Sequence, residues 1–385
     1  MVDDQGTTAS SRPGGTPDDV PDALRDASEA EEFLCDNCGA RMRWDPDADA
    51  LLCEHCDHLQ QVAAGSGTVL ERPLEDAGDA ARGLGLEVRV LRCDECGAQV
   101  TLEGMTTTDR CVYCDSAQVL AQDANRNALR PESLVPLDVG RKTVEKAFRK
   151  WLGGLWFRPT ALKTEAKKRS ATGIYVPFWT FDCQVHSDWT ASSGTYYYVT
   201  VTVPTMVNGK MKMRRKRVRK IRWRPAAGQR DDVYDDLLVA ASCGIPAELV
   251  ARLGRFDTTA LVPYRPEYLA GWRAEEYQLD LMDGWAQGQR RIEETQERRC
   301  GNDVPGDTYR FLQVHNTIRE VRWKHVLLPV WSLAYTFKGR HFRVLVHGQT
   351  GRVVGEAPYS WIKIGLAVLA LAGAIGAVVV ASGGI

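Results

Sequence analysis

With 385 residues, the chain has room for two or three domains, and a content of 44% hydrophobic and 26% charged residues is ordinary for a globular protein. The net charge of -1 hides acidic and basic stretches that lie apart along the sequence. It therefore excludes neither an acidic nor a basic partner. The metal-ligand spacing of the cysteines and the lack of an N-terminal signal peptide argue against secretion and for a reducing compartment, where thiolates stay available for zinc.

The predicted order of domains follows the changes in composition. Residues 1–30 are rich in Asp, Gly, Pro, Ser and Thr, which predicts a disordered acidic tail. Further segments are predicted as a zinc ribbon at 31–60, a linker with a short helix at 61–87, a second zinc ribbon at 88–122, an α+β domain at 130–358, and a transmembrane helix at 362–385.

Eight of the 11 cysteines form two copies of one pattern, C-x₂-C-x₁₄-C-x₂-C, and the second copy begins 58 residues after the first. A C-x₂-C turn directs two sulfurs at one point, so each quartet is expected to hold one structural Zn²⁺, giving two ions in all. Gly39 and Gly97 follow the first turn of each copy, where a positive φ is often needed. The predicted ligands are Cys35, Cys38, Cys53, Cys56, Cys93, Cys96, Cys111 and Cys114. The remaining Cys183, Cys243 and Cys300 are interpreted as packing residues.

Both predicted ribbons are acidic. Each has an excess of about three Asp or Glu residues, and four thiolates with one Zn²⁺ add two more negative charges, so each carries about -5. Because such a surface repels phosphates, the ribbons favour a protein partner over nucleic acid.

Changes of hydrophobic period along 130–358 predict a mixed α+β domain with an antiparallel sheet. Helices are expected at 141–152, 160–169, 246–253 and 274–300, and strands at 174–189, 309–323, 325–337, 341–347 and 352–354. The sequence Tyr175-Val-Pro-Phe-Trp179 is partly repeated as Leu327-Leu-Pro-Val-Trp331, which fits two related strands of a duplicated β core.

A basic hairpin is predicted at 195–224, with Asn208-Gly209 as its two-residue turn. If Val207 pairs with Lys210, cations occupy both faces of the returning strand, so the hairpin should project as an arm. Anionic lipid, nucleic acid, or no ligand at all remain open, and the predicted membrane anchor favours lipid over nucleic acid. The basic residues are Lys210, Lys212, Arg214, Arg215, Lys216, Arg217, Arg219, Lys220, Arg222 and Arg224.

Residues 364–385 contain no charge, and 22 apolar or small residues are enough to cross a bilayer, which predicts a transmembrane helix. Tyr359 and Trp361 fit an interfacial belt, and Lys363 predicts that the preceding domains lie in the cytoplasm of a single-pass membrane protein. Small residues such as Gly373 and Ala377, four positions apart, would allow two copies to pair as a homo-oligomer.

Several motifs together resemble a family of bacterial membrane proteins with a double zinc ribbon and one C-terminal span. Besides the cysteines, they are Arg130-Pro-Glu-Ser-Leu134, Gly154-Leu-Trp-Phe-Arg-Pro159, Tyr175-Val-Pro-Phe-Trp-Thr-Phe181, Leu261-Val-Pro-Tyr-Arg-Pro266, Lys324-His-Val-Leu-Leu-Pro-Val-Trp331, Gly348-Gln-Thr-Gly351 and Pro358-Tyr-Ser-Trp361. Members are often labelled primosomal protein N′ or replication-restart helicase, yet this chain has no G-x₄-G-K-[ST] phosphate loop. The resemblance also implies membrane-stress scaffold proteins, of the phage-shock or SPFH type, as partners.

No catalytic motif accompanies the histidines, so the chain is predicted not to be an enzyme. The histidines considered, and interpreted as scattered polar residues of strands, are His186, His315, His325, His341 and His347. The predicted function is that of a membrane-anchored cytosolic adaptor whose zinc ribbons dock protein partners. The alternative is a membrane-tethered nucleic-acid-binding protein that uses the basic hairpin at 210–224.

Overall fold

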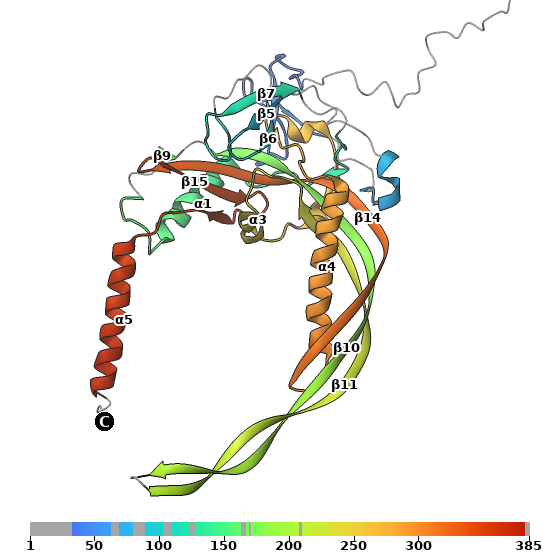
Figure 1. The fold of residues 1–385 in the computed structure, drawn as a ribbon. Coiled ribbons are helices and arrows are strands. Elements are labelled where there is room, and N and C mark those ends of the chain that lie inside the picture. The colour runs from blue at the N-terminus through green and yellow to red at the C-terminus, as the bar shows by residue number, and fades with distance from the viewer. Residues whose placement is uncertain are drawn as a thin grey trace, which may run out of the picture.

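One ten-stranded sheet dominates the computed structural model, which describes residues 33–62, 69–79, 89–102, 110–123, 128–162, 167–168, 171–207 and 210–381 (Figure 1). The predicted disordered tail at 1–30 lies outside these residues. The main strands of the sheet follow the order β11-β10-β14-β15-β16. Their bounds are Thr172–Val207 for β10, Lys210–Ala240 for β11, Thr308–Phe337 for β14, Arg340–His347 for β15 and Val353–Gly355 for β16.

Shorter elements surround this sheet. The strands β4 (Arg72–Pro73), β8 (Ser133–Leu134), β9 (Lys167–Lys168), β12 (Val262–Pro263) and β13 (Arg273–Ala274) pair at its margins. The helices are α1 (Arg141–Gly154), α3 (Ala247–Leu253), α4 (Leu281–Asp303) and α5 (Trp361–Ala381), with short 3₁₀ turns η2 (Leu74–Asp79), η3 (Thr258–Ala260) and η4 (Pro266–Leu269).

Two small sheets form the cysteine-containing modules. The first consists of β1 (Met42–Asp45), β2 (Ala50–Cys53) and β3 (Leu59–Gln60), and the second of β5 (Arg89–Cys93), β6 (Gln99–Leu102) and β7 (Val119–Asp123). We call them ribbon 1 (33–60) and ribbon 2 (89–123).

The two faces of the large sheet carry separate hydrophobic cores, because side chains alternate along a strand. Tyr175 and Trp331 belong to the core that includes ribbon 1, whereas Val176 and Leu328 belong to the core that includes ribbon 2. The two ribbons therefore cover opposite faces of the same pair of strands, β10 and β14.

The pairing of β10 with β14 ends where Gly194 lies opposite Thr308, and beyond this point β10 pairs with β11 alone. A Cβ at Gly194 would lie 2.8 Å from both Thr308 Cγ2 and the Trp223 ring, so this close approach favours glycine. We define the two-stranded segment 195–222 as the arm. At about 3.3 Å per residue it extends about 40 Å from the sheet (Figure 1).

The predicted α+β fold class is wrong, because strands predominate over helices in the described chain. The strands β10, β11 and β14 are much longer than expected. Bulges between Phe181 and Cys183 and between Thr190 and Ser192 accommodate irregular positions, so the pairing continues past them. The helices expected at 141–152 and 246–253 are confirmed as α1 and α3. The one expected at 160–169 contains β9, and the one expected from 274 begins only at Leu281, because β13 pairs with β10.

The predicted transmembrane helix at 362–385, and with it the single-pass membrane localisation, is contradicted. No helix within the described part of the chain is both long and apolar enough to cross a membrane.

Candidate metal centres and the basic arm

The eight predicted cysteine ligands form two separate quartets, and the four sulfurs of each lie within 4.8 Å of one another. In ribbon 1, Sγ of Cys35 lies 3.6 Å from that of Cys56, and Sγ of Cys38 lies 3.5 Å from that of Cys53. The matching pairs of ribbon 2 are Cys93 with Cys114 and Cys96 with Cys111, each at 3.6 Å. A tetrahedral site with Zn–S bonds of about 2.3 Å separates its sulfurs by about 3.8 Å, so both quartets fit zinc.

Each C-x₂-C turn ends in a residue with positive φ. Gly39 and Gly97 have φ of 72° and 77°, as the sequence predicts, and Asp57 and Asp115 take the same role with 56° and 62°. In all four turns the N–H of this residue donates to the carbonyl of the first cysteine, over 2.8 to 3.1 Å. The backbone of each turn thus directs its two sulfurs toward one point.

The cysteine pKa values of each quartet shift in both directions: a hydrogen bond with Cys111 raises the pKa of Cys96, whereas other sulfurs are held toward the thiolate form that zinc requires. The pKa of Cys56 is lowered to about 6, mainly by the backbone N–H of His58 and also by the side-chain amide of Asn37, which lies 3.6 Å from Sγ. In ribbon 2 the pKa of Cys114 is lowered to about 2, chiefly by a hydrogen bond from Cys111.

Ribbon 1 is fixed to the sheet through tryptophans. Trp44 is buried, its backbone N–H donates to the carbonyl of Ala270 over 2.8 Å, and its backbone carbonyl accepts a hydrogen bond from Nε1 of Trp272 over 2.9 Å. The Trp272 ring lies edge-on to that of Trp331 in β14, with 5.2 Å between centroids. Trp272 therefore joins ribbon 1 to one face of the sheet, because it bonds to the backbone of the ribbon and packs against Trp331.

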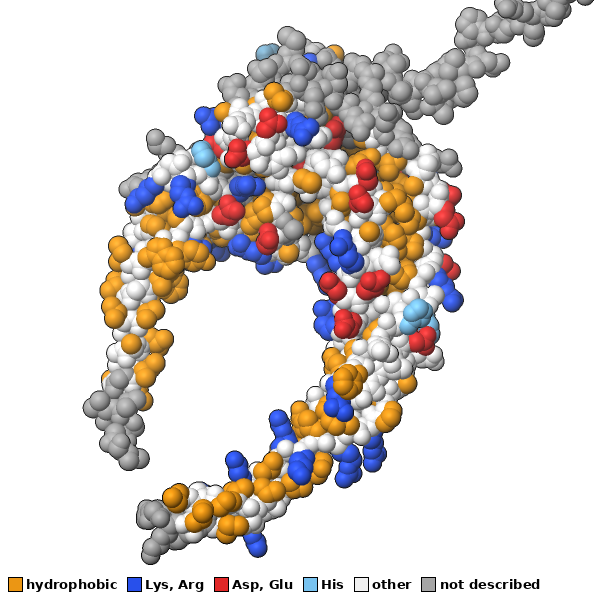
Figure 2. Space-filling model, in the orientation of Figure 1, with side chains coloured by type: hydrophobic (Ala, Val, Ile, Leu, Met, Phe, Trp, Pro, Cys, Tyr) orange, Lys and Arg blue, Asp and Glu red, His pale blue; other side chains and the backbone are white. Residues whose placement is uncertain are grey.

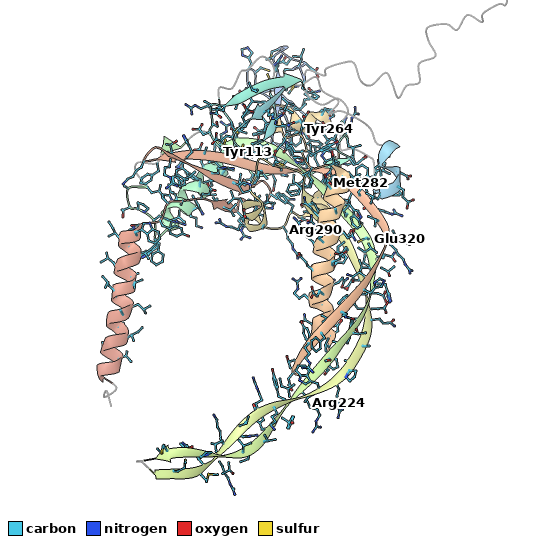
Figure 3. All side chains as sticks on the ribbon, viewed as in Figure 1. Tyr113, Arg224, Tyr264, Met282, Arg290 and Glu320 are labelled. Carbon is cyan, nitrogen blue, oxygen red and sulfur yellow. The ribbon has the colours of Figure 1, made fainter. Side chains whose placement is uncertain are left out.

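Ribbon 2 is fixed to the opposite face by polar contacts. The hydroxyl of Tyr113, between two cysteine ligands, donates to the buried carboxylate of Glu275 over 2.9 Å, and the Ser242 hydroxyl donates to the same carboxylate over 2.8 Å. The hydroxyl of Ser332 in β14 donates to the carbonyl of Val112 over 2.8 Å. Tyr113 lies at the ribbon end of the molecule, far from Arg224 on the outer part of the long strands (Figure 3). Each ribbon is thus part of the domain core.

A third group with metal-like spacing contains Asp182, Asp235 and Asp236. It already has a cation, because Nζ of the buried Lys324 lies 2.7 Å from Asp236, 3.1 Å from Glu71 and 3.9 Å from Asp182. Burial raises the pKa of Asp182 to about 6. We interpret this group as a structural ion cluster inside the three-stranded part of the sheet, where β11, β10 and β14 lie side by side. Sequence reasoning missed it because its members come from β10, β11 and β14 and form no local motif.

The basic residues of the hairpin lie where the sequence predicts them. Val207 pairs with Lys210, Val203 with Arg214 and Thr202 with Arg215. The cations whose side chains are described, all of them exposed, are Arg214, Arg215, Lys216, Arg217, Arg219, Lys220, Arg222 and Arg224. The side chains of Lys210 and Lys212 lie outside the described residues.

Other candidate residues are dispersed. Cys183 and Cys300 are buried, as expected of packing residues, whereas Cys243 is exposed. His325 is buried and lies 2.9 Å from the carbonyl of Leu129, whereas His186 lies 2.7 Å from Asp231 on the outer part of the sheet. In the described chain neither histidine belongs to a group with metal-ligand spacing.

We expect two zinc ions per chain. Cys35→Ser and Cys93→Ser should each reduce the zinc content measured by mass spectrometry to one ion, and each should lower the midpoint of thermal unfolding, because each ribbon covers one face of the sheet. Cys243→Ser is the matched control, since this cysteine lies outside both quartets, and it should retain two ions. One ion per wild-type chain, or iron in place of zinc, would contradict the paired assignment.

Glu275 should make stability depend on pH. Its pKa is raised to about 7, first because burial disfavours the charged form, whereas an unfolded glutamate has a pKa of about 4.3. The protonated Glu275 therefore stabilises the folded chain fully below the unfolded pKa, and this contribution is lost as the pH rises through about 7. From pH 6 to pH 8, the free energy of unfolding of wild type should fall by about 1 kcal/mol more than that of Glu275→Gln.

Urea unfolding at the two pH values measures this difference. The exposed Glu293 of α4 provides the control, because Glu293→Gln removes the same charge from a solvated position. An identical pH dependence for wild type and Glu275→Gln would show that Glu275 does not retain its proton in the folded chain.

Among known proteins, the chain is similar to the uncharacterized protein YdjG of Bacillus subtilis (strain 168), with 26% identity over 344 residues that cover 86% of this chain and 91% of YdjG. No family model matches the chain. No solved structure matches it either. The two cysteine quartets support the double zinc ribbon of the resemblance drawn from sequence, and because YdjG is itself uncharacterized, function has to be argued from the residues of this chain.

Proposed function

We propose that the chain binds nucleic acid through its arm, and that the zinc ribbons stabilise the sheet from which the arm projects. The observation that carries this proposal is a two-stranded ribbon with exposed cations on both faces. From Thr195 to Arg230 the sequence contains no Asp or Glu, and Figure 2 shows Lys and Arg without acidic side chains along the outer arm.

The distribution of the cations follows from the register of β10 and β11. Directly opposed residues point to the same face, and successive residues point to opposite faces. Arg215, Arg217 and Arg219 therefore share one face with Thr202, Thr200 and Tyr198, while Arg214, Lys216 and Lys220 share the other with Val203, Val201 and Tyr197. In the described chain none of these six cations forms an ion pair with a carboxylate, so all are free to meet phosphates.

Three consecutive tyrosines add surfaces on which bases can stack. Guanidinium carbons of Arg217, Arg219 and Arg222 lie 4.5, 4.2 and 5.4 Å from the ring centroids of Tyr198, Tyr196 and Tyr197. Aromatic rings and guanidinium planes both stack on nucleobases, and arginine also binds phosphate with two parallel hydrogen bonds.

The geometry favours nucleic acid over a lipid surface. The preference for lipid depended on a membrane anchor, and the described chain contains no such helix. A flat surface reaches only one face of a ribbon, whereas a groove has phosphates on both sides and the major groove admits a two-stranded β-ribbon. The acidic zinc ribbons lie at the far end of the sheet from the arm, where they do not oppose this contact (Figure 1).

The adaptor role stays a prediction. Both ribbons pack against the sheet of their own chain through Trp44 and Tyr113, which leaves only their outer surfaces for a protein partner. The arm contacts Asp307 through the N–H of Tyr196 at its base, whereas its described outer part pairs only β10 with β11, and it therefore provides the stronger argument for a binding function.

Fluorescence anisotropy of the full zinc-loaded chain with a labelled 30-base-pair duplex tests the proposal. The test variant combines Arg214→Gln, Arg215→Gln, Lys216→Gln and Arg217→Gln. The logarithm of the wild-type binding constant should fall linearly with the logarithm of salt concentration, by about 0.9 for each phosphate contact. The variant should bind at least about tenfold more weakly. The magnitude of its slope should be smaller by the equivalent of up to about four phosphate contacts.

The matched control removes the same number of exposed cations from α1, as Arg141→Gln, Lys142→Gln, Lys146→Gln and Lys150→Gln. It should bind as wild type does, because α1 lies away from the arm. An equal loss of affinity in both variants would show that net charge causes the effect, and it would contradict the arm as the contact. Binding to anionic vesicles without any binding to duplex or single-stranded nucleic acid would contradict the proposal itself.

A further inference from the structure

The end of the arm differs chemically from the rest of it. Met206, Met211 and Met213 are exposed over 73%, 74% and 67% of their surface. Met206 lies opposite Met211, and Pro204 lies opposite Met213, so all four residues share one face at the outermost part of the described arm. Figure 2 shows hydrophobic side chains gathered at this end. An arm that acted only through its charges would have no need of this apolar tip.

We propose that this tip is an apolar wedge that enters the base stack of a duplex, so that the chain bends the nucleic acid it binds. The inference rests on the proposed function and specifies its ligand as double-stranded. Proteins that bend duplexes often insert Met, Pro or other apolar side chains between base steps, and the larger protein surface that a bent duplex can wrap offsets the cost of unstacking.

The charges beside the tip suit this role. Arg215 follows Met213 on the same face of the ribbon, about 7 Å along the strand, while Arg214 points to the opposite face. Cations on both sides of an inserted apolar group can hold the phosphates that flank an opened base step. Methionine adapts to an irregular gap through its three rotatable bonds and its polarisable sulfur.

The reach of the arm is also sufficient. The two grooves of a duplex are about 7.5 to 8.5 Å deep, whereas the arm extends about 40 Å beyond the three-stranded sheet. The tip can therefore reach the bases while Arg217 and Arg219, nearer the sheet, remain on the backbone. A single strand exposes its bases to the tyrosines without a wedge, so the tip favours a duplex.

Resonance energy transfer between dyes at the two ends of a 20-base-pair duplex tests the inference. Saturating amounts of the full zinc-loaded wild-type chain should raise the transfer efficiency, because the ends approach each other when the duplex bends. The variant Met206→Ser, Met211→Ser, Met213→Ser should bind the duplex within about tenfold of wild type, since the cations remain, but should not raise the efficiency. Changing the same residues to leucine should restore the bend.

The outcomes separate the wedge from nucleic-acid binding itself. Wild-type binding without any change in efficiency, or a serine variant that bends as well as wild type, would overturn the wedge and leave the proposed function standing. Absence of binding in wild type would overturn both. Methionine-dependent binding to vesicles of phosphatidylcholine and phosphatidylglycerol, or a methionine-dependent dimer in sedimentation velocity, each without duplex bending, would assign the tip to lipid or to a second copy and overturn the wedge.

Discussion

Antiparallel pairing of β10 with β14 is the interaction on which both zinc ribbons and the arm depend. It runs from Thr172 opposite Ser332 to Gly194 opposite Thr308. Because its side chains alternate between two faces, one pair of strands supports two cores, and each core contains one ribbon. An ion held by either quartet would therefore stabilise more than its own ribbon, because each ribbon covers one face of the central sheet. Beyond Gly194 the same strand loses its third partner and becomes the arm.

Charge is distributed along this strand in a way that agrees with two different tasks. At the ribbon end, acidic modules surround the predicted metal sites, and the outer end carries only cations. Between them, Lys324 compensates the carboxylates of Glu71, Asp182 and Asp236 within the three-stranded part of the sheet. A buried charge left without its partner typically costs about 3–5 kcal/mol, so this cluster fixes how the three strands meet. The arm can then remain cationic without disturbing the packed sheet.

The features that sequence reasoning identified are local ones. Four cysteines at fixed spacing predict a quartet, and the two β-rich segments predict the register from Val207 opposite Lys210 onward, while the predicted turn at Asn208-Gly209 lies outside the described residues. The repeated Pro-x-Trp segments were also visible, and the structure pairs them directly, with Tyr175 opposite Pro329 and Pro177 opposite Leu327. Contacts between residues distant in sequence were not predictable. Nothing near Tyr113 indicates that Glu275 accepts a hydrogen bond from its hydroxyl. The fold class was wrong for a similar reason, because strand length depends on partners and bulges that local periodicity does not reveal.

Hydrogen–deuterium exchange of the full zinc-loaded chain, with and without saturating duplex, tests most directly whether the arm is the nucleic-acid contact. The account predicts slower exchange in peptides from 195–222, where outer amides of a two-stranded ribbon are otherwise open to water, and unchanged exchange in ribbons 1 and 2. Protection confined to the zinc ribbons, with an unaffected arm, would contradict it.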